Sequence, residues 1–255
     1  MNVEGKVAIV TGGGTGVGRA TALDLARRGC AVAINYSRSA AEAEQTAADV
    51  AKLGPKSLAF RADVADDGAC RALVDATVRE LGRVDVLVQS AGVTSFIPHA
   101  NLDAVGADDW SRILGVNLIG AFQMARAVRA PMDAAGAGVI VNVSSVAGIA
   151  GVGSSIPYCA SKAGVNNLTI TLARALAPKI RVVAVAPGFI TGRWLEGGLG
   201  TAAYDAVRKA MEAKAPLGRV CEPEDVSAAI LSLICGSDLV TGIVVPVEGG
   251  MLIAG

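Results

Sequence analysis

The sequence has little or none of several features that mark particular classes of protein. Its 255 residues include one histidine, and its five cysteines form no C-x-x-C pair, so we predict neither a metal site nor a disulfide framework. The formal net charge is zero, which argues against a nucleic-acid surface or a polybasic membrane anchor. No run of about 18 or more apolar residues occurs, and the first residues lack the basic start and long apolar stretch of a signal peptide. We therefore expect a cytoplasmic protein with reduced thiols and with no nucleic acid or membrane among its partners.

Short apolar runs alternate along the chain with stretches of helical spacing. The runs lack the strict alternation of half-buried strands, which is typical of strands covered on both faces. They lie at residues 6–10, 31–35, 57–60, 84–88, 138–143, 180–185 and 242–247. The helical stretches cover residues 16–29, 40–53, 67–81, 109–135, 158–177 and 223–235. This order predicts an α/β fold in a single domain, residues 1–255, with a Rossmann-type doubly wound parallel sheet of about seven strands and helices on both faces.

The segment 188–216 has the least regular pattern and is rich in glycine. It is predicted to be a substrate lid, with a long surface loop carrying a short helix as the alternative. Specificity in such a fold lies in loops, here 93–101, 146–157 and 188–216. Apolar side chains in these loops suggest a pocket wall, namely Phe96, Ile97, Ile149, Val152, Phe189, Trp194 and Leu195.

A glycine-rich loop, "T-G-G-G-T-G-V-G" at residues 11–18, follows the first predicted strand and precedes the first helix. Glycines there permit a tight turn and let backbone N–H groups approach a pyrophosphate, and the helix N-terminus adds a favourable dipole. The cofactor-binding candidates in this loop are Gly12, Gly14, Thr15, Gly16, Val17 and Gly18.

The residues after the second predicted strand bear on the choice of cofactor. A dinucleotide-binding fold usually has an acidic residue there for the ribose hydroxyls, but this strand ends "I-N-Y-S-R-S" with no carboxylate before Glu42. Ser37 and Arg38 can instead donate hydrogen bonds to a 2′-phosphate. The sequence therefore favours NADP (NADPH) over NAD, and the alternative is that Arg38 is only a solvated residue at a helix start.

A tyrosine and a lysine stand four residues apart in "Y-C-A-S-K-A-G", residues 158–164. On a helix these positions share one face, and the Lys162 ammonium would then lower the pKa of the Tyr158 hydroxyl. The alternative is an ordinary helix with a partly buried tyrosine and a solvated lysine. The small residues Ala160, Ala163 and Gly164 would let this helix pack closely against the sheet or a partner subunit.

The order of these motifs resembles the short-chain dehydrogenase/reductase family over essentially the whole chain. The resemblance rests on T-G-x-x-x-G-x-G, on Ser145 thirteen residues before Tyr158, and on Y-x-x-x-K. Further segments that match are "RADV", "QSAG", "GVNLIGAF" and "APGFIT". The resemblance implies further cofactor contacts at Asp63, Val64, Ser90, Ala91, Gly92, Tyr158, Lys162, Pro187, Gly188, Ile190 and Thr191.

The resemblance implies hydride transfer between a nicotinamide and a small-molecule carbonyl or secondary alcohol substrate. Ser145 would donate a hydrogen bond to the substrate oxygen, and Tyr158 would act as general acid or base. Lys162 would lower the pKa of the tyrosine and hold the nicotinamide ribose, and Asn117 would hold a water linking the lysine to solvent. The family also implies a homotetramer built on the helices at 109–135 and 158–177.

The nearest look-alikes in the family are the 3-oxoacyl carrier-protein reductases, so an acyl carrier protein is a candidate partner. Arg126, Arg129 and Lys179 could dock it, although surface cations are usually only solvated. The alternative function is a dinucleotide-binding sensor or scaffold without turnover. A sugar-nucleotide epimerase or dehydratase is disfavoured because 255 residues leave no room for a substrate domain.

Three departures from the family pattern stand out. Gln89 and Ser90 replace two asparagines that support the fourth strand and the cofactor ribose. The glycine loop carries Thr15 and no arginine, so the preference for NADP depends on the residues after the second strand. Pro246 lies in the last strand, which predicts an edge strand because proline cannot donate a ladder hydrogen bond.

Overall fold

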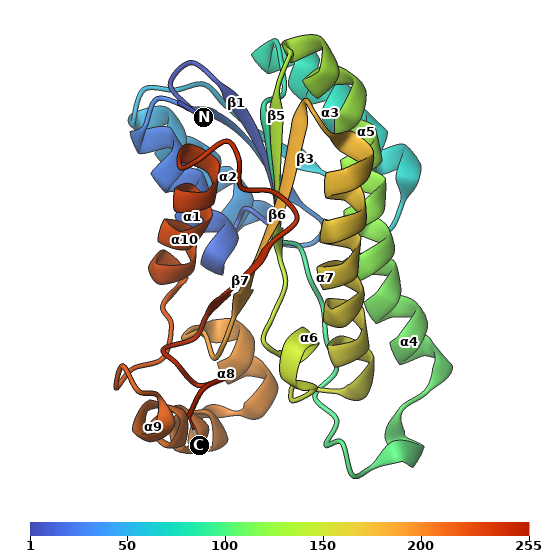
Figure 1. Cartoon of the computed structure of the whole chain (residues 1–255), viewed down its shortest axis with the longest axis vertical. Coiled ribbons are helices and arrows are strands. Elements are labelled where there is room, and N and C mark those ends of the chain that lie inside the picture. The colour runs from blue at the N-terminus through green and yellow to red at the C-terminus, as the bar shows by residue number, and fades with distance from the viewer. Residues whose placement is uncertain (255) are drawn as a thin grey trace.

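The computed structural model describes residues 1–254 and contains a seven-stranded parallel sheet between two layers of helices (Figure 1). The strands are β1 (Val7–Thr11), β2 (Ala31–Tyr36), β3 (Ser57–Arg61), β4 (Val86–Gln89), β5 (Gly138–Val143), β6 (Ile180–Pro187) and β7 (Val244–Val247). Their spatial order is β3-β2-β1-β4-β5-β6-β7. The order reverses between β1 and β4, and ligands bind beside such a point in open α/β sheets. The predicted fold class is confirmed.

Long helices cover the two faces of the sheet. One face carries α1 (Gly16–Arg27), α2 (Ala40–Lys52) and α10 (Pro223–Cys235); the other carries α3 (Asp67–Leu81), α5 (Gly120–Ala135) and α7 (Ile156–Leu176). The shorter elements are η1 (Leu102–Ala104), α4 (Ala107–Leu114), η2 (Gly115–Ile119), α6 (Ala147–Ala150), α8 (Arg193–Leu199) and α9 (Thr201–Lys214). The helices α6, α8 and α9 gather at the lower end of the sheet in Figure 1.

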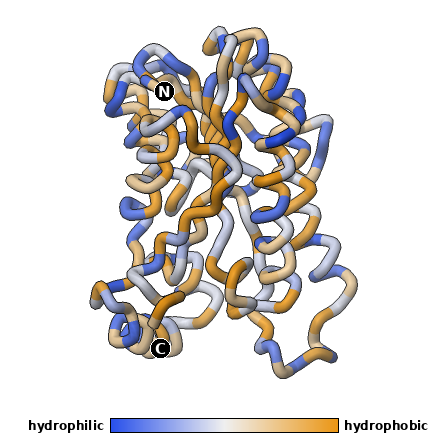
Figure 2. Tube along the Cα trace, in the orientation of Figure 1, coloured by the Kyte–Doolittle hydropathy of each residue, from blue (hydrophilic) through white to orange (hydrophobic). Residues whose placement is uncertain are grey.

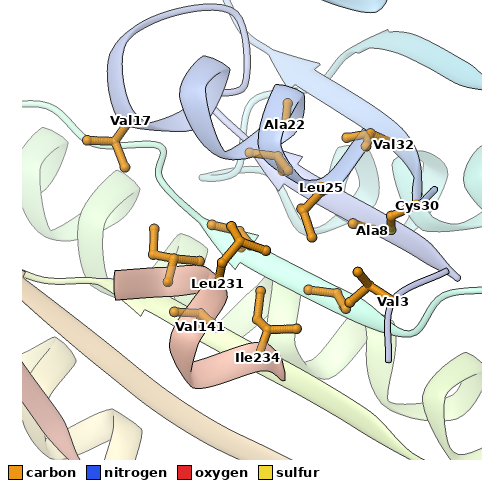
Figure 3. Close-up of a cluster of buried hydrophobic side chains, with 14 of the residues drawn as sticks. Val3, Ala8, Val17, Ala22, Leu25, Cys30, Val32, Val141, Leu231 and Ile234 are labelled. Atoms are coloured by element: carbon orange, nitrogen blue, oxygen red, sulfur yellow. The ribbon is translucent and has the colours of Figure 1, made fainter. Parts of the chain in front are cut away.

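A hydrophobic cluster fills each side of the sheet, as the band of apolar residues through the centre of Figure 2 indicates. Figure 3 shows part of one cluster, where Ala22 and Leu25 of α1 face Leu231 and Ile234 of α10. Every residue of β1 is buried. The absence of strict alternation in the strands therefore reflects burial on both faces.

Two predicted elements differ from the structure. The helix expected at 109–135 is interrupted by the π-helical turn η2, which separates α4 from α5. A Cβ atom on Gly120 would stand 2.9 Å from the Val64 carbonyl oxygen, so the chain after η2 packs directly on the loop after β3. The segment 188–216 is more regular than predicted, because it contains both α8 and α9.

The edge position of the last strand follows its sequence. Pro246 of β7 pairs with Ala186 of β6, and β7 has no neighbour on its other side among residues 1–254. The proline thus costs the sheet no hydrogen bond on that side. In the same range, no helix combines the length and the apolarity that crossing a bilayer would require.

Candidate active site

The glycine loop lies at the carboxyl end of β1 and is shaped by close backbone contacts. A Cβ atom on Gly12, whose φ is +63°, would stand 3.0 Å from the Ala91 backbone, and one on Gly18 would stand 2.3 Å from the Gly12 carbonyl oxygen. The following helix α1 has no side-chain cap at Thr15 and no acidic residue in its first turn. Its N-terminal N–H groups are therefore available to an anion, and the loop fits the pyrophosphate of a dinucleotide.

The two residues expected to select the cofactor lie just beyond β2. Ser37 and Arg38 are both exposed, and Arg38 forms no ion pair with the rest of residues 1–254. Across the cleft, Asp63 is exposed after β3, and its Oδ1 accepts a hydrogen bond from the Ala65 N–H at 3.0 Å. Val64 beside it is buried under α5. The chain thus brings both sides of the expected adenosine site to the same edge of the sheet.

Two adjacent serines follow β5, and they have different surroundings. Ser144 is buried, and its hydroxyl bonds the Lys162 carbonyl oxygen at 3.2 Å and the Asn166 amide oxygen at 2.5 Å. Ser145 is only partly buried, and its Oγ accepts a hydrogen bond from the Ala147 N–H at 3.1 Å. Ser144 therefore serves the contact between β5 and α7. Ser145 keeps a hydroxyl close to Tyr158, as the family spacing implies.

Tyr158 lies in the first turn of α7, whose start is capped by Ser155. The tyrosine is partly exposed as a residue, but burial around its hydroxyl raises its pKa to about 12, and a hydrogen bond with Ser145 only partly offsets this. The sequence-based expectation was a lowered pKa. The phenol therefore keeps its proton well above neutral pH.

The position of Lys162 explains the difference. Its side chain is 6% exposed, and its Nζ donates to the Val143 carbonyl oxygen at 2.7 Å. The Nζ lies 5.7 Å from the centre of the Tyr158 ring, so the two residues do share one face of α7. Burial lowers the pKa of the lysine from 10.5 to about 8, because no carboxylate compensates its charge. The ammonium is directed to a backbone carbonyl, and it does not offset the effect of burial on the pKa of Tyr158.

Asn117 of η2 uses its whole amide group to connect three segments. Its Nδ2 donates to the Val93 carbonyl oxygen and to the Ser161 hydroxyl, both at 3.0 Å, and its Oδ1 accepts from the Val93 N–H at 2.8 Å. A cavity of about 10 Å³ adjoins Asn117 and Lys162, which is roughly the space of one water molecule. The π-helical turn thus brings the asparagine to the strand end where the resemblance implied it.

A buried polar chain behind this cavity was not assigned from the sequence. Gln89 donates from its Nε2 to the Asn142 Oδ1 at 3.0 Å, and Asn142 donates to the Thr169 hydroxyl at 2.9 Å. All three residues are buried. They tie β4 and β5 to α7 at the level of the cavity. The available signal was the presence of polar residues at the ends of two otherwise apolar strands.

Comparison with known proteins decides the family. The model of the family described as short chain dehydrogenase matches residues 6–196. The chain belongs to the short-chain dehydrogenase/reductase family. This confirms the resemblance found in the sequence and makes the protein an NAD(P)-dependent oxidoreductase of that family.

Several members of the short-chain dehydrogenase/reductase family resemble this chain over its whole length. It is 41% identical to a Streptomyces violaceoruber protein named as ketoacyl reductase 2 of the granaticin polyketide synthase, over 97% of this chain and 96% of the relative. It is 40% identical to cis-4-hydroxycyclohexanecarboxylate dehydrogenase of Sinomonas cyclohexanicum, over 96% of both chains. The crystal structure of NAD⁺-bound xylitol dehydrogenase superposes with a TM-score of 0.90 at 31% identity, covering 98% of this chain and 100% of that one.

The expected nicotinamide-binding segment of this short-chain dehydrogenase/reductase is attached to the core on two sides. The Gly188 N–H donates to the Val247 carbonyl oxygen at 2.9 Å, and the Thr191 N–H donates to the Cys221 carbonyl oxygen at 2.8 Å. Pro187, the last residue of β6, is buried. Ile190 forms an isolated parallel bridge with Cys221. This anchored stretch leads directly into α8.

Residues 188–216, which we call the cover segment, bring an aromatic side chain to Tyr158. The Trp194 ring of α8 lies 6.2 Å from the Tyr158 ring and 6.1 Å from the Phe96 ring. A Cβ atom on Gly198 would stand 1.9 Å from the Phe96 ring, so α8 packs on this ring through a glycine. Loops 93–101 and 188–216, far apart in sequence, therefore meet beside Tyr158.

Proposed function

We propose that this protein is an NADP(H)-dependent reductase that interconverts a carbonyl and a secondary alcohol, with the cover segment as its substrate lid. The observation that carries the proposal is the grouping of Ser145, Tyr158 and a buried Lys162 at the carboxyl ends of β5 and β6, the same edge of the sheet at which the glycine loop follows β1. The nicotinamide supplies or accepts the hydride when it is bound. The chain's own residues bind the substrate oxygen and move its proton.

The surroundings of the tyrosine suit proton donation. Ser145 donates a hydrogen bond to the substrate oxygen as negative charge develops there. Tyr158, which its high pKa keeps protonated, passes its proton to that oxygen in reduction and takes it back in oxidation. Lys162 lies on the same face of α7 and, once its ammonium leaves the Val143 carbonyl, can stabilise the resulting phenolate. The lysine can then pass a proton to the phenolate, and Asn117 and the adjoining cavity offer room for a water that replaces the proton on the lysine.

The choice of NADP rests on the residues beyond β2. An exposed Arg38 that forms no ion pair within residues 1–254 is suited to a 2′-phosphate, and Ser37 can add a second donor. Arg38→Ala should therefore weaken NADPH binding much more than NADH binding, as measured by calorimetric titration of both cofactors. Equal losses would remove the basis for the NADP proposal.

The substrate class is proposed from the lining near Tyr158 and from the relatives. Phe96 and Trp194 offer an apolar, aromatic wall, which suits a carbonyl carried on a hydrocarbon or ring. The relatives named above include a ketoacyl reductase and a dehydrogenase of a cyclohexane acid. We propose both 3-oxoacyl thioesters and small cyclic ketones as the first substrates to examine.

Docking of an acyl carrier protein would involve cations that already have partners. Arg126 pairs with Asp67 at 2.6 Å and Arg129 with Asp133 at 3.6 Å, so an acidic partner would have to displace these carboxylates. Lys179 is exposed. A carrier-bound 3-oxoacyl substrate should have a lower KM than its small-molecule thioester if such docking occurs.

We also propose a homotetramer built on α5 and α7. Ile119, Phe122 and Ile170 are exposed on or beside these helices, and apolar side chains of this kind are enriched at subunit contacts. Gly164 and Leu118, in contrast, pack on each other within one chain. Light scattering on the eluting protein should give four times the chain mass, and a monomer at micromolar concentration would contradict the proposal.

One assay distinguishes the proposed activity from the alternative function, a dinucleotide-binding sensor without turnover. Purified protein is mixed with NADPH and a panel of cyclic ketones and 3-oxoacyl thioesters, and the nicotinamide absorbance is followed. Tyr158→Phe should lower turnover by about a thousandfold while sparing cofactor binding, because only the transferable proton is removed. Near-normal activity of this variant would show that another group is the acid. Cofactor binding without turnover across the panel would favour the sensor.

A further inference from the structure

An ion pair joins the cover segment to the cofactor side of the cleft. Arg193, the first residue of α8, has its Nη2 atom 2.8 Å from the Oε1 atom of Glu42 in the first turn of α2. The two side chains remain 64% and 41% exposed. This contact connects α2, which packs beside α1, with α8 at the lower end of the sheet (Figure 1).

The location of this ion pair relates it to the expected path of the cofactor. A Cβ atom on Gly14 would stand 3.0 Å from the Ala43 N atom and 3.3 Å from the Glu42 carbonyl carbon, so the start of α2 touches the glycine loop. At its other end, Arg193 is two residues from Thr191, which is expected to contact the nicotinamide. The arginine therefore starts next to the segment expected to hold the nicotinamide, and its guanidinium contacts a residue whose backbone adjoins the loop expected to hold the phosphates.

The backbone at Gly192 fixes the point from which the Arg193 side chain extends. The Gly192 N–H donates to the hydroxyl of Tyr204 at 3.1 Å, and Tyr204 is buried against the Phe189 ring at 5.5 Å. Gly192 has a φ of +126°, a conformation that side chains rarely allow. The direction in which Arg193 leaves the chain is thus set by the attachment of the cover segment.

The energies favour an exchange of partners. An ion pair as exposed as Arg193 with Glu42 is screened by water and contributes little to stability, so giving it up costs little. A guanidinium binds a phosphate through two parallel hydrogen bonds and prefers it to a single carboxylate oxygen. Arg19, which also lies near the glycine loop, is already bound to Asp49 at 3.0 Å and to the Thr46 hydroxyl.

We propose that Arg193 is a phosphate-binding residue that the cover segment contributes to the cofactor site. Glu42 holds its guanidinium beside the glycine loop until a dinucleotide arrives, and Arg193 then exchanges the carboxylate for a phosphate group. Arg193 precedes Trp194, whose ring lies 6.2 Å from the Tyr158 ring, so the exchange links cofactor binding to the substrate wall. The inference depends on the proposed dinucleotide binding, but not on turnover.

The test compares Arg193→Ala with Arg208→Ala. Arg208 is a matched control, because it lies in the same segment, on α9, and pairs with Glu212 at 2.8 Å. Dissociation constants are measured by calorimetry for NADP⁺, NAD⁺, ADP-ribose and 2′,5′-ADP. We expect Arg193→Ala to weaken binding about tenfold and Arg208→Ala to leave it unchanged. Arg193→Lys should recover part of the loss, and Glu42→Gln should bind at least as tightly as the unaltered protein.

The four ligands distinguish the source of the phosphate. Equal losses for NADP⁺, NAD⁺ and ADP-ribose assign Arg193 to the pyrophosphate, whereas a loss confined to NADP⁺ and 2′,5′-ADP assigns it to the 2′-phosphate. Unchanged affinity of Arg193→Ala for all four overturns the inference while leaving the proposed activity intact. If the unaltered protein binds none of them, both proposals fail. If it binds them but turns over no substrate, only the proposed activity fails.

Discussion

Two regions adjoin Tyr158 and are held by different kinds of contact. One is the cover segment; the other, which we call the floor, consists of the carboxyl ends of the strands together with α6 and α7. In the floor, backbone segments pack directly on each other. A Cβ atom on Gly148 of α6, for example, would stand 2.5 Å from the Lys162 carbonyl carbon of α7. In the cover segment, α8 has no buried residue and α9 has only Tyr204. Backbone hydrogen bonds attach the start of the segment, residues 188–191, to the core, whereas aromatic contacts and exposed ion pairs hold the two helices. The floor can therefore fix the reacting groups, while the cover segment can change its contacts when ligands bind.

The largest expected effect is a difference in the free energy of unfolding between two glycine-to-alanine variants, one in each region. Gly148→Ala would drive a methyl group into the backbone of α7 and should lower the free energy of unfolding by about 3 kcal/mol. Gly197→Ala in α8 meets no atom within 4 Å and should be neutral or stabilising by up to about 1 kcal/mol. Urea unfolding of both variants measures the difference. Similar losses would mean that the two regions are equally rigid.

The second expected effect concerns the buried charge of the floor. The pKa of Lys162 is lowered by burial from 10.5 to about 8, so the folded state releases this proton more readily than the unfolded chain. The charged lysine therefore costs stability below pH 8, and that cost disappears as the pH rises from about 8 to 10.5. Lys162→Met should raise the free energy of unfolding by about 2 kcal/mol at pH 7 and by only about 0.5 kcal/mol near pH 10.

Thermal melts of Lys162→Met and of the unaltered protein between pH 7 and 10 check this dependence. The pH range stops there because the raised pKa of Tyr158 adds an opposite trend, in which stability falls between about 10 and 12. A gain that stays constant with pH would indicate better packing by methionine and not removal of a charge. A loss at pH 7 would mean that the bond to the Val143 carbonyl outweighs the burial cost.

The third effect tests the polar chain under the cavity. Gln89→Leu leaves the Asn142 Oδ1 without its donor in a buried position, which should lower the free energy of unfolding by about 2 kcal/mol. Gln45→Leu is the control, because Gln45 bonds Asp49 on the exposed surface of α2 and should change stability by less than about 0.5 kcal/mol. Equal effects in denaturant titrations would mean that the amide chain contributes no more than a surface contact.

The floor could be predicted from the sequence far better than the cover segment, for a physical reason. The glycine loop, Ser145 and the Tyr158 and Lys162 pair belong to short motifs whose geometry is set by the strand or helix that carries them. The contacts of Phe96 with Gly198 and of Glu42 with Arg193 join residues about 100 or more positions apart, and no local pattern encodes them. The same limit applies to Lys162, since its bond to the Val143 carbonyl, which changes the expected pKa, is a tertiary contact.

The smallest expected effect on stability is also the most specific to the cover segment. Gly198→Ala would place a methyl group 1.9 Å from the Phe96 ring, so either the ring turns or α8 moves away from Tyr158. The ring is half-exposed and can shift at a cost below about 1 kcal/mol, which leaves unfolding almost unchanged. The substrate wall, however, is altered, and KM for the best carbonyl substrate should rise about fivefold with kcat nearly constant. Gly197→Ala, one residue away and facing open space, should leave KM unchanged. If Gly198→Ala instead lowers kcat and leaves KM unchanged, the contact between Phe96 and Gly198 positions Tyr158. The cover segment would then take part in the reaction itself, and the division between the two regions would be wrong.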